Sequence, residues 1–187
     1  MLKTCDILDE KDKRLRQVSK EVTFPLTNDD KKLIDIMIQY LHDSQIDELA
    51  EKYNLRPGMG LSAIQLGVAK RFFVVVYELT GPDDLEKEFE TYVLVNPKII
   101  SNSMEKIYVT DGEGCLSVNR PVEGIVPRYA RVTVEAYDMD GNKIQVRARE
   151  DLAICFQHEI DHLNGILFVD HIDKNNPFKG KDSMRAI

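Results

Sequence analysis

The sequence predicts an α+β fold in which mostly antiparallel sheets pack around a central helix near the C-terminus. Short runs of β-branched and aromatic residues gather in the middle of the chain, with helical patterns before and after them. Asp140 and Gly141 separate two of these runs, and this pair is a strong signal for a two-residue hairpin. Hairpins join antiparallel strands, so the sheet is expected to be mainly antiparallel.

The first predicted helix begins near Thr27–Asp30, where polar side chains can cap it and acidic groups lie at the positive end of its dipole. Its apolar face recurs at helical spacing, at Leu33, Met37, Tyr40 and Leu41. A second helical piece is predicted from Ile46 to Asn54. It ends before Pro57 and Gly58, which favour a turn.

Strands are predicted where β-branched and aromatic residues cluster, at Arg71–Leu79, Tyr92–Ile100, Glu105–Val109, Arg131–Asp138 and Lys143–Arg149. Glu150 and Asp151 can then cap a strongly apolar helix over Leu152–Asn164, which Gly165 would end. We expect a short strand at Ile166–Ile172 and a polar tail after it.

Composition limits the class of protein. At 187 residues with 43% hydrophobic side chains, and without repeats or a linker rich in Pro and Gly, residues 1–187 are expected to form a single domain. A net charge of −7 without a cluster of Lys and Arg argues against nucleic acid as a partner. No apolar run approaches the roughly 18 residues of a membrane span. The N-terminal residues lack the pattern of a signal peptide, so we expect a cytoplasmic protein without a membrane partner.

The cysteines number three, at Cys5, Cys115 and Cys155. An odd number, spread over a chain long enough to fold without covalent links, argues against a disulfide framework. They are better interpreted as free thiols or metal ligands.

The strongest chemical signal is the segment from His158 to His162 inside the predicted apolar helix. The two histidines are four residues apart, slightly more than one turn, so both imidazoles project from one face toward one metal ion. Glu159 lies beside them, where it can act as a base. The alternative is that the two histidines bind no metal and are simply solvated or core residues. The charged Glu159 and Asp161 among apolar residues would then have no explanation.

A catalytic metal usually takes a third protein ligand and keeps one position for water. The best donor is Cys115, in the glycine-containing loop Asp111–Ser117, although an isolated cysteine is more often a small core residue. Two alternatives remain at this stage. A peptidase would take its third ligand downstream, where Asp170 and His171 are candidates. A structural site would be closed by four protein ligands and would not need Glu159.

Three segments resemble, in order, the three signature motifs of peptide deformylases, at Gly58–Gln65, Glu113–Ser117 and Gln157–His162. The inserted stretch Gly81–Thr91 and the segment Val118–Gly124 are similar to the second class of the family, typical of Gram-positive bacteria. Ser62 stands where the family usually has Ala, and both residues are small.

The resemblance implies hydrolysis of the formyl group from the N-terminal formylmethionine of nascent polypeptides, with release of formate. It implies one divalent ion, Fe2+ in the cell and replaceable by Zn2+, Ni2+ or Co2+, on Cys115, His158 and His162. The helix would then be the metal-bearing centre of the fold. The nucleophile would be metal-bound water, with Glu159 as general base and then general acid. The side chain of Gln65 and the backbone N–H of Leu116 would stabilise the charged oxygen.

Substrate contacts follow from the same motifs. Gly58, Gly60 and Gly114 would let the substrate backbone pass closely, although they can also be turn residues. We hypothesise that the methionine pocket is lined by Met59, Ile154 and Cys155, since the last two share the ligand face of the helix. Plain core packing is the alternative for both. An ion pair of Glu113 with Arg128 would support the cysteine loop, while His42 and His171 receive no role. A transient contact of the Asn175–Ile187 tail with the ribosome stays open.

Overall fold

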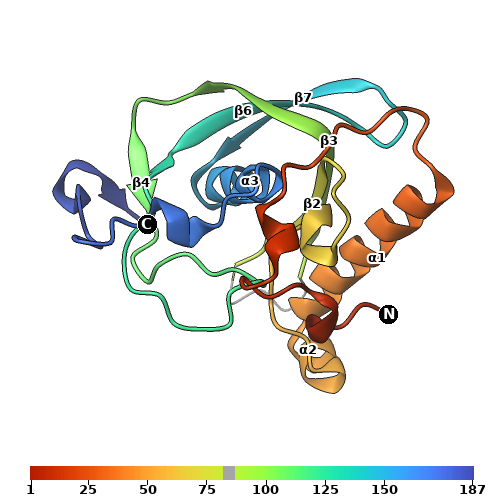
Figure 1. The fold of residues 1–187 in the computed structure, drawn as a ribbon, viewed down its shortest axis with the longest axis horizontal. Coiled ribbons are helices and arrows are strands. Elements are labelled where there is room, and N and C mark those ends of the chain that lie inside the picture. Colours follow the sequence, from red (N-terminus) through yellow and green to blue (C-terminus); the bar gives the residue numbers. More distant parts are fainter. Residues whose placement is uncertain (82–86) are drawn as a thin grey trace.

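The computed structural model describes residues 1–81 and 87–187 and has the α+β architecture expected from the sequence. Within those residues, one sheet has the order β1-β2-β3-β6-β7 and a second has the order β5-β4-β8. The strands β3, β6 and β7 curve over α3, which lies in the middle of the molecule (Figure 1).

The strands are β1 (Gly60–Ser62), β2 (Phe72–Glu78), β3 (Phe89–Asn102), β4 (Lys106–Tyr108), β5 (Arg128–Tyr129), β6 (Arg131–Tyr137), β7 (Lys143–Arg149) and β8 (Arg185–Ala186). The α-helices are α1 (Asn28–Ser44), α2 (Asp47–Tyr53) and α3 (Glu150–Leu163). Short 3-10 helices are η1 (Thr4–Asp6), η2 (Lys13–Arg16), η3 (Ala63–Leu66), η4 (Phe168–His171) and η5 (Lys181–Ser183). No helix in the described part of the chain is both long and apolar enough to cross a membrane.

Helix α1 begins at the predicted capping cluster. The Thr27 hydroxyl accepts a hydrogen bond from the Asp30 N–H at 3.2 Å, and the Asp30 carboxylate accepts one from the Thr27 N–H at 3.3 Å. Each group satisfies a donor that the first helical turn leaves without a partner. Of the predicted apolar face, Met37, Tyr40 and Leu41 are buried and Leu33 is partly buried. Ile34, which was not predicted, is fully buried as well.

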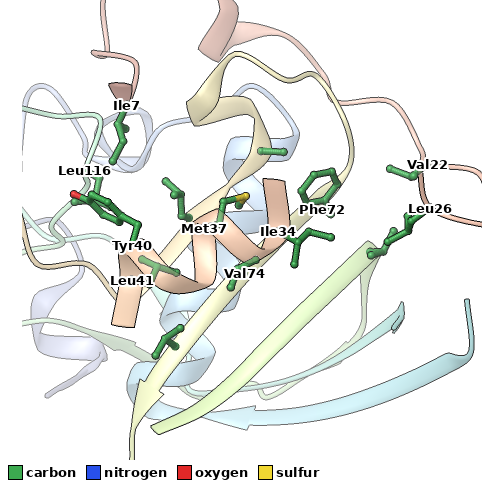
Figure 2. Packing of buried hydrophobic residues seen from close by; sticks show 14 of the residues in the cluster. Ile7, Val22, Leu26, Ile34, Met37, Tyr40, Leu41, Phe72, Val74 and Leu116 are labelled. Carbon is green, nitrogen blue, oxygen red and sulfur yellow. The ribbon is translucent and has the colours of Figure 1, made fainter. Parts of the chain in front are cut away.

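Strand β2 is buried on both faces, which explains its unbroken apolar run. Phe72 and Val74 pack with the α1 residues (Figure 2), whereas Phe73 and Val75 pack with α3. The rings of Phe73 and Phe156 lie 5.7 Å apart. Successive strand residues point to opposite faces, so helices on both sides require apolar residues at every position. Each fully buried large side chain contributes roughly 1.5–3 kcal/mol.

The predicted β6–β7 hairpin is present, with antiparallel pairing from Arg131 opposite Arg149 to Tyr137 opposite Lys143. Its turn is longer than the predicted two residues. The Asp138 N–H donates to the Asn142 carbonyl at 2.9 Å, so three residues form the loop. The last of them, Gly141, has a φ of 86°, as in a type I turn followed by a left-handed residue.

The prediction of a strand at Ile166–Ile172 is wrong. This segment contains the 3-10 helix η4, whose turn is closed locally. The Asp170 N–H donates to the Leu167 carbonyl at 2.9 Å, and the Leu167 N–H donates to the Asp170 carboxylate at 2.8 Å. These backbone groups are therefore satisfied within the turn rather than by a neighbouring strand.

Three further elements differ from the expectation. Strands β1 and β5 were not among the predicted strands, and the polar tail contains β8, which pairs in parallel with β4. In the insertion predicted at Gly81–Thr91, residues 82–86 lie outside the described residues, and the last three residues begin β3. The cysteines at positions 5, 115 and 155 are free, as predicted.

Candidate metal centre

The predicted ligand residues converge at the buried face of α3. His158 Nε2 and His162 Nε2 lie 3.1 Å apart, and Cys115 Sγ lies 3.3 Å from His162 Nε2. The three ligand atoms are all within 4.8 Å of one another. A tetrahedral ion with bonds of about 2.0–2.3 Å would separate its ligand atoms by roughly 3.3–3.6 Å. The separations of 3.1 and 3.3 Å are slightly shorter than this range, so a small adjustment of the side chains would fit a small divalent ion.

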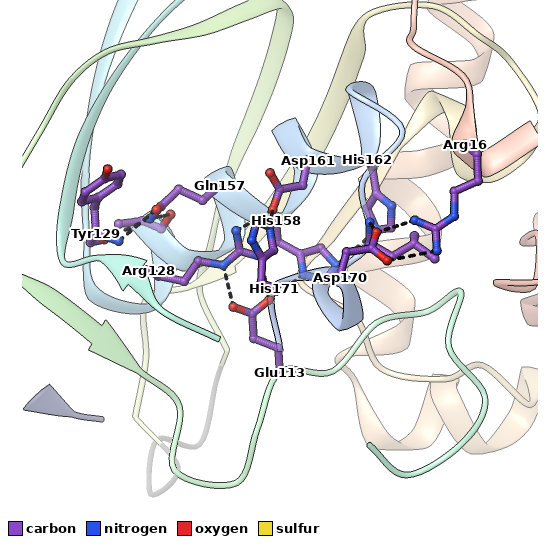
Figure 3. A network of polar contacts seen from close by, with 12 residues as sticks. Arg16, Glu113, Arg128, Tyr129, Gln157, His158, Asp161, His162, Asp170 and His171 are labelled. Carbon is purple, nitrogen blue, oxygen red and sulfur yellow. Dashed lines mark hydrogen bonds and ion pairs between the residues drawn. The ribbon is translucent and has the colours of Figure 1, made fainter. Parts of the chain in front are cut away.

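A buried ion-pair network orients one of these histidines (Figure 3). Glu113 Oε2 lies 2.9 Å from His158 Nδ1, and both Glu113 oxygens accept hydrogen bonds from Arg128, at 2.6 and 2.9 Å. Burial alone would raise the pKa of the Glu113 carboxyl, but its hydrogen bonds with Arg128 and His158 lower it to about 2. The carboxylate is thus ionised at neutral pH and accepts a hydrogen bond from Nδ1–H, so that Nε2 is the ring nitrogen left to bind a metal.

The same network continues through the helix to the C-terminal segment. Arg128 Nη1 donates to Asp161 Oδ2 at 2.6 Å, and His171 Nε2 lies 2.7 Å from the same oxygen. Burial lowers the pKa of His162 well below its usual value. A neutral imidazole is the form that binds a metal.

The Glu159 carboxylate is buried beside the histidines, with only 3% of the residue exposed. Burial raises the pKa of this carboxyl above its usual value, while His158 and the Ser62 hydroxyl act in the opposite direction. A carboxylate with a raised pKa is a stronger proton acceptor. Glu159 therefore has the environment of a general base.

Gln65 is held with its amide in one orientation. Its Oε1 accepts the Ser62 N–H at 2.8 Å, and its Nε2 donates to Ser117 Oγ at 3.1 Å and lies 3.9 Å from Cys115 Sγ. The NH2 end of the amide thus faces the cysteine loop. An N–H donor in that place can stabilise negative charge on an oxygen bound near the metal site.

A cavity of about 360 Å3 opens onto these groups. Nearly all of the predicted site residues line it: Gly58, Met59, Gly60, Gln65, Gly114, Cys115, Leu116, Ile154, Cys155, His158 and Glu159. His162 is fully buried behind them. The segments that resemble the three motifs therefore meet at one cavity although they lie far apart in the chain.

The family model described as Polypeptide deformylase matches residues 4–178. The chain belongs to the peptide deformylase family. It is 48% identical over 187 residues to the peptide deformylase of Macrococcus caseolyticus, covering 100% of both chains. It is 46% identical over 187 residues to peptide deformylase 2 of Bacillus cereus, covering 100% of this chain and 99% of the relative. These relatives confirm the predicted likeness to the second, Gram-positive-like class.

Solved deformylase structures share the fold. The crystal structure of the Ehrlichia chaffeensis peptide deformylase aligns with a TM-score of 0.72 and 36% identity, covering 90% of this chain and 88% of that one. As a deformylase, the chain is a hydrolase that removes the N-formyl group from nascent peptides.

Three residues near the deformylase site had no predicted role there. The Arg56 guanidinium donates hydrogen bonds to the carbonyls of Cys115 and Val118, so it holds the cysteine loop from outside. Asp151 lines the cavity, and His171 contacts Asp161. Asp151 could have been found from its helical spacing, because it stands seven residues, about two turns, before His158. Arg56 carries no comparable signal, since its partners are 59 and 62 residues away in the chain. His171 lies beyond the end of the helix that carries Asp161, so helical spacing does not connect the two.

Proposed function

We propose that this deformylase uses Cys115, His158 and His162 to hold one divalent cation, and that Glu159 transfers the protons of the reaction. The observation that supports this most is the convergence of one sulfur and two imidazole nitrogens on a cavity that Glu159 also lines. A cation bound there would polarise the formyl carbonyl and lower the pKa of a water molecule toward 7. We propose Fe2+ as the cellular ion, as the resemblance to peptide deformylases implies. A donor set of one thiolate and two imidazoles can also bind Zn2+, Ni2+ and Co2+.

The protein's own groups then divide the work. Glu159 takes a proton from the attacking water and delivers it to the departing amine of the methionine. The Gln65 amide and the Leu116 backbone N–H stabilise the formyl oxygen as it gains negative charge, and one such donor is typically worth about 3–4 kcal/mol. Formate and a free N-terminal methionine are the products.

The apolar side chains that line the cavity are proposed to bind the methionine side chain. Met59, Ile154 and Cys155 line the cavity, and burial raises the pKa of the Cys155 thiol, so this group stays neutral and apolar. The glycines at 58, 60 and 114 line the same cavity and would admit the peptide backbone. We further propose that residues 1–187 form one catalytic domain. Because the substrate is the nascent chain, we propose that the enzyme acts in the cytoplasm and contacts the ribosome transiently. We propose no nucleic acid or membrane partner.

The test is formate release from a formyl-methionyl peptide by the parent protein and by Glu159→Gln. We expect the variant to bind about one metal per chain, as the parent does, and to lose at least 100-fold in kcat, because general acid–base catalysis contributes about that much or more. The control is Glu51→Gln, which changes an exposed residue of α2. Cleavage of unformylated peptide bonds would favour a peptidase. Equal turnover by Glu159→Gln and its parent would remove Glu159 from the chemistry.

A further inference from the structure

Strand β1 runs directly along the carboxylate of Glu159. Gly60 and Ser62 are two residues apart, so they lie on the same face of the strand. A Cβ built on Gly60 would lie 2.6 Å from Glu159 Oε1, which shows how closely the strand backbone approaches that oxygen. Ser62 Oγ lies 2.6 Å from the other oxygen, Oε2, and 3.0 Å from the Glu159 carbonyl oxygen. One strand therefore lies close to both oxygens of the carboxylate and donates a hydrogen bond to one of them, Oε2.

The Ser62 hydroxyl is well suited to orient this group. Ser62 is fully buried, and its hydroxyl has a single hydrogen to donate. The bond to Oε2 is short, as expected for a hydroxyl that donates to a carboxylate, and such bonds are about twice as strong as neutral ones. Oε1 then lies beside Gly60, a cavity-lining residue, and Oε2 lies on the side of the buried serine.

Ser62 also contacts the other polar group of the site. The Ser62 backbone N–H donates a hydrogen bond to Gln65 Oε1 at 2.8 Å. The NH2 end of that amide is therefore directed toward Ser117 and the cysteine loop. One residue therefore sets the orientation of both Glu159 and Gln65.

We propose that Ser62 is a positioning residue for Glu159: its hydroxyl holds Oε2 so that Oε1 is presented to the cavity for proton transfer. This inference rests on the proposed function of Glu159. Because the hydroxyl orients the base and lies outside the substrate cavity, its loss should lower kcat and leave KM nearly unchanged.

The experiment compares Ser62→Thr with Ser62→Val in the metal-loaded enzyme. The two side chains have nearly the same volume, and only threonine keeps the hydroxyl, so any packing disturbance is shared. We expect kcat with a formyl-methionyl peptide to be about tenfold lower in the valine variant than in the threonine variant, with KM values within twofold. Ser62→Ala, which cannot overpack the site, should resemble the valine variant. In a Glu159→Gln background, the alanine change should have no further effect.

A second readout does not depend on turnover. Crystal structures of the valine and threonine variants should show the Glu159 carboxylate rotated in the former and unmoved in the latter. Equal kcat values for valine and threonine, parent-like kcat for alanine, or an unmoved carboxylate in the valine variant would each overturn the positioning role. If the parent itself releases no formate, the proposed function fails, whereas the crystal structures still test the orientation of Glu159 by Ser62.

Discussion

His158 Nδ1 and Glu113 Oε2 lie 2.9 Å apart, and Arg128 holds the Glu113 carboxylate from its other side with bonds of 2.6 and 2.9 Å. Both Glu113 and Arg128 are almost fully buried. The carboxylate cannot turn away from the histidine without losing both of its hydrogen bonds to the buried guanidinium, and breaking a buried pair is costly. The imidazole is therefore locked before any metal binds.

Glu113→Gln is expected to weaken metal binding about 10–100-fold, the usual effect of removing the group that orients a histidine ligand. The amide is nearly the same shape but lacks the negative charge that strengthens the hydrogen bond from His158 Nδ1–H and pairs with Arg128. Competition with a chelator, followed by metal analysis of the protein, measures the affinity. Glu135→Gln is the matched control, because Glu135 pairs with Lys143 on the surface. Equal affinities in the two variants would contradict the orienting role.

Replacing Cys115 by serine is expected to abolish stoichiometric metal binding, since a serine hydroxyl is not ionised at neutral pH and is a poor substitute for a thiolate. Zn2+ should raise the Tm of the parent, because a ligand that binds only the folded state stabilises it, and should leave the Tm of Cys115→Ser unchanged. Cys5→Ser is the control, since Cys5 is exposed. Retention of about one Zn2+ per chain by Cys115→Ser would remove the sulfur from the ligand set.

Local signals explain which parts of the fold could be predicted from the sequence. The capping cluster at Thr27–Asp30 and the apolar run of β2 act over a few residues, so their elements were predicted to within a residue or two. Strand β1 has only three residues and exists because Gly60–Ser62 pairs with Phe73–Val75 of β2. The parallel pairing of β8 likewise depends on a strand about 80 residues away. Neither pairing leaves a periodic pattern within so short a segment.

The site residues also fall into two groups: some are predictable from the sequence, and the contacts of others are visible only in the folded chain. The histidine pair on α3 was predictable from helical spacing, and Glu113 with Arg128 from the resemblance, and the structure places these groups in contact. The hydrogen bond from Ser62 to Glu159 joins residues 97 positions apart, so only the folded chain reveals what the serine touches. The bonds from Arg56 to the cysteine loop are equally nonlocal.

Gly60→Ala is expected to destabilise the protein by about 1–3 kcal/mol, the range for overpacking a close-packed site. The new methyl group would lie 2.6 Å from Glu159 Oε1 and 2.8 Å from Cys155 Sγ, so one of these must move. Urea unfolding measures the change in free energy. Gly114→Ala is a matched control for stability, because a Cβ there meets no atom within 4 Å. Equal unfolding free energies for the two variants would contradict the close approach of β1 to α3.

The buried carboxylate of Asp30 should make the stability of the protein depend on pH. Asp30 accepts hydrogen bonds from the Thr27 hydroxyl at 2.7 Å and from Lys70 Nζ at 2.5 Å. Burial alone would raise the pKa of this carboxyl, but Lys70 and Thr27 lower it below 3.8. A lowered pKa means that the ionised group stabilises the fold at pH values above 3.8, and that this contribution is lost as the pH falls through the lowered pKa.

Asp30→Asn should therefore cost about 1–3 kcal/mol at pH 7, the range for hydrogen bonds to a charged group, and progressively less as the pH falls below about 4. Urea unfolding of the metal-free parent and variant between pH 7 and pH 3 measures the difference. The matched control is Asp29→Asn in the same helical turn, where the exposed carboxylate interacts mainly with the helix dipole and should contribute at most about 1 kcal/mol. A cost for Asp30→Asn that stays constant from pH 7 to pH 3 would show that the contribution of Asp30 does not come from its ionised carboxylate.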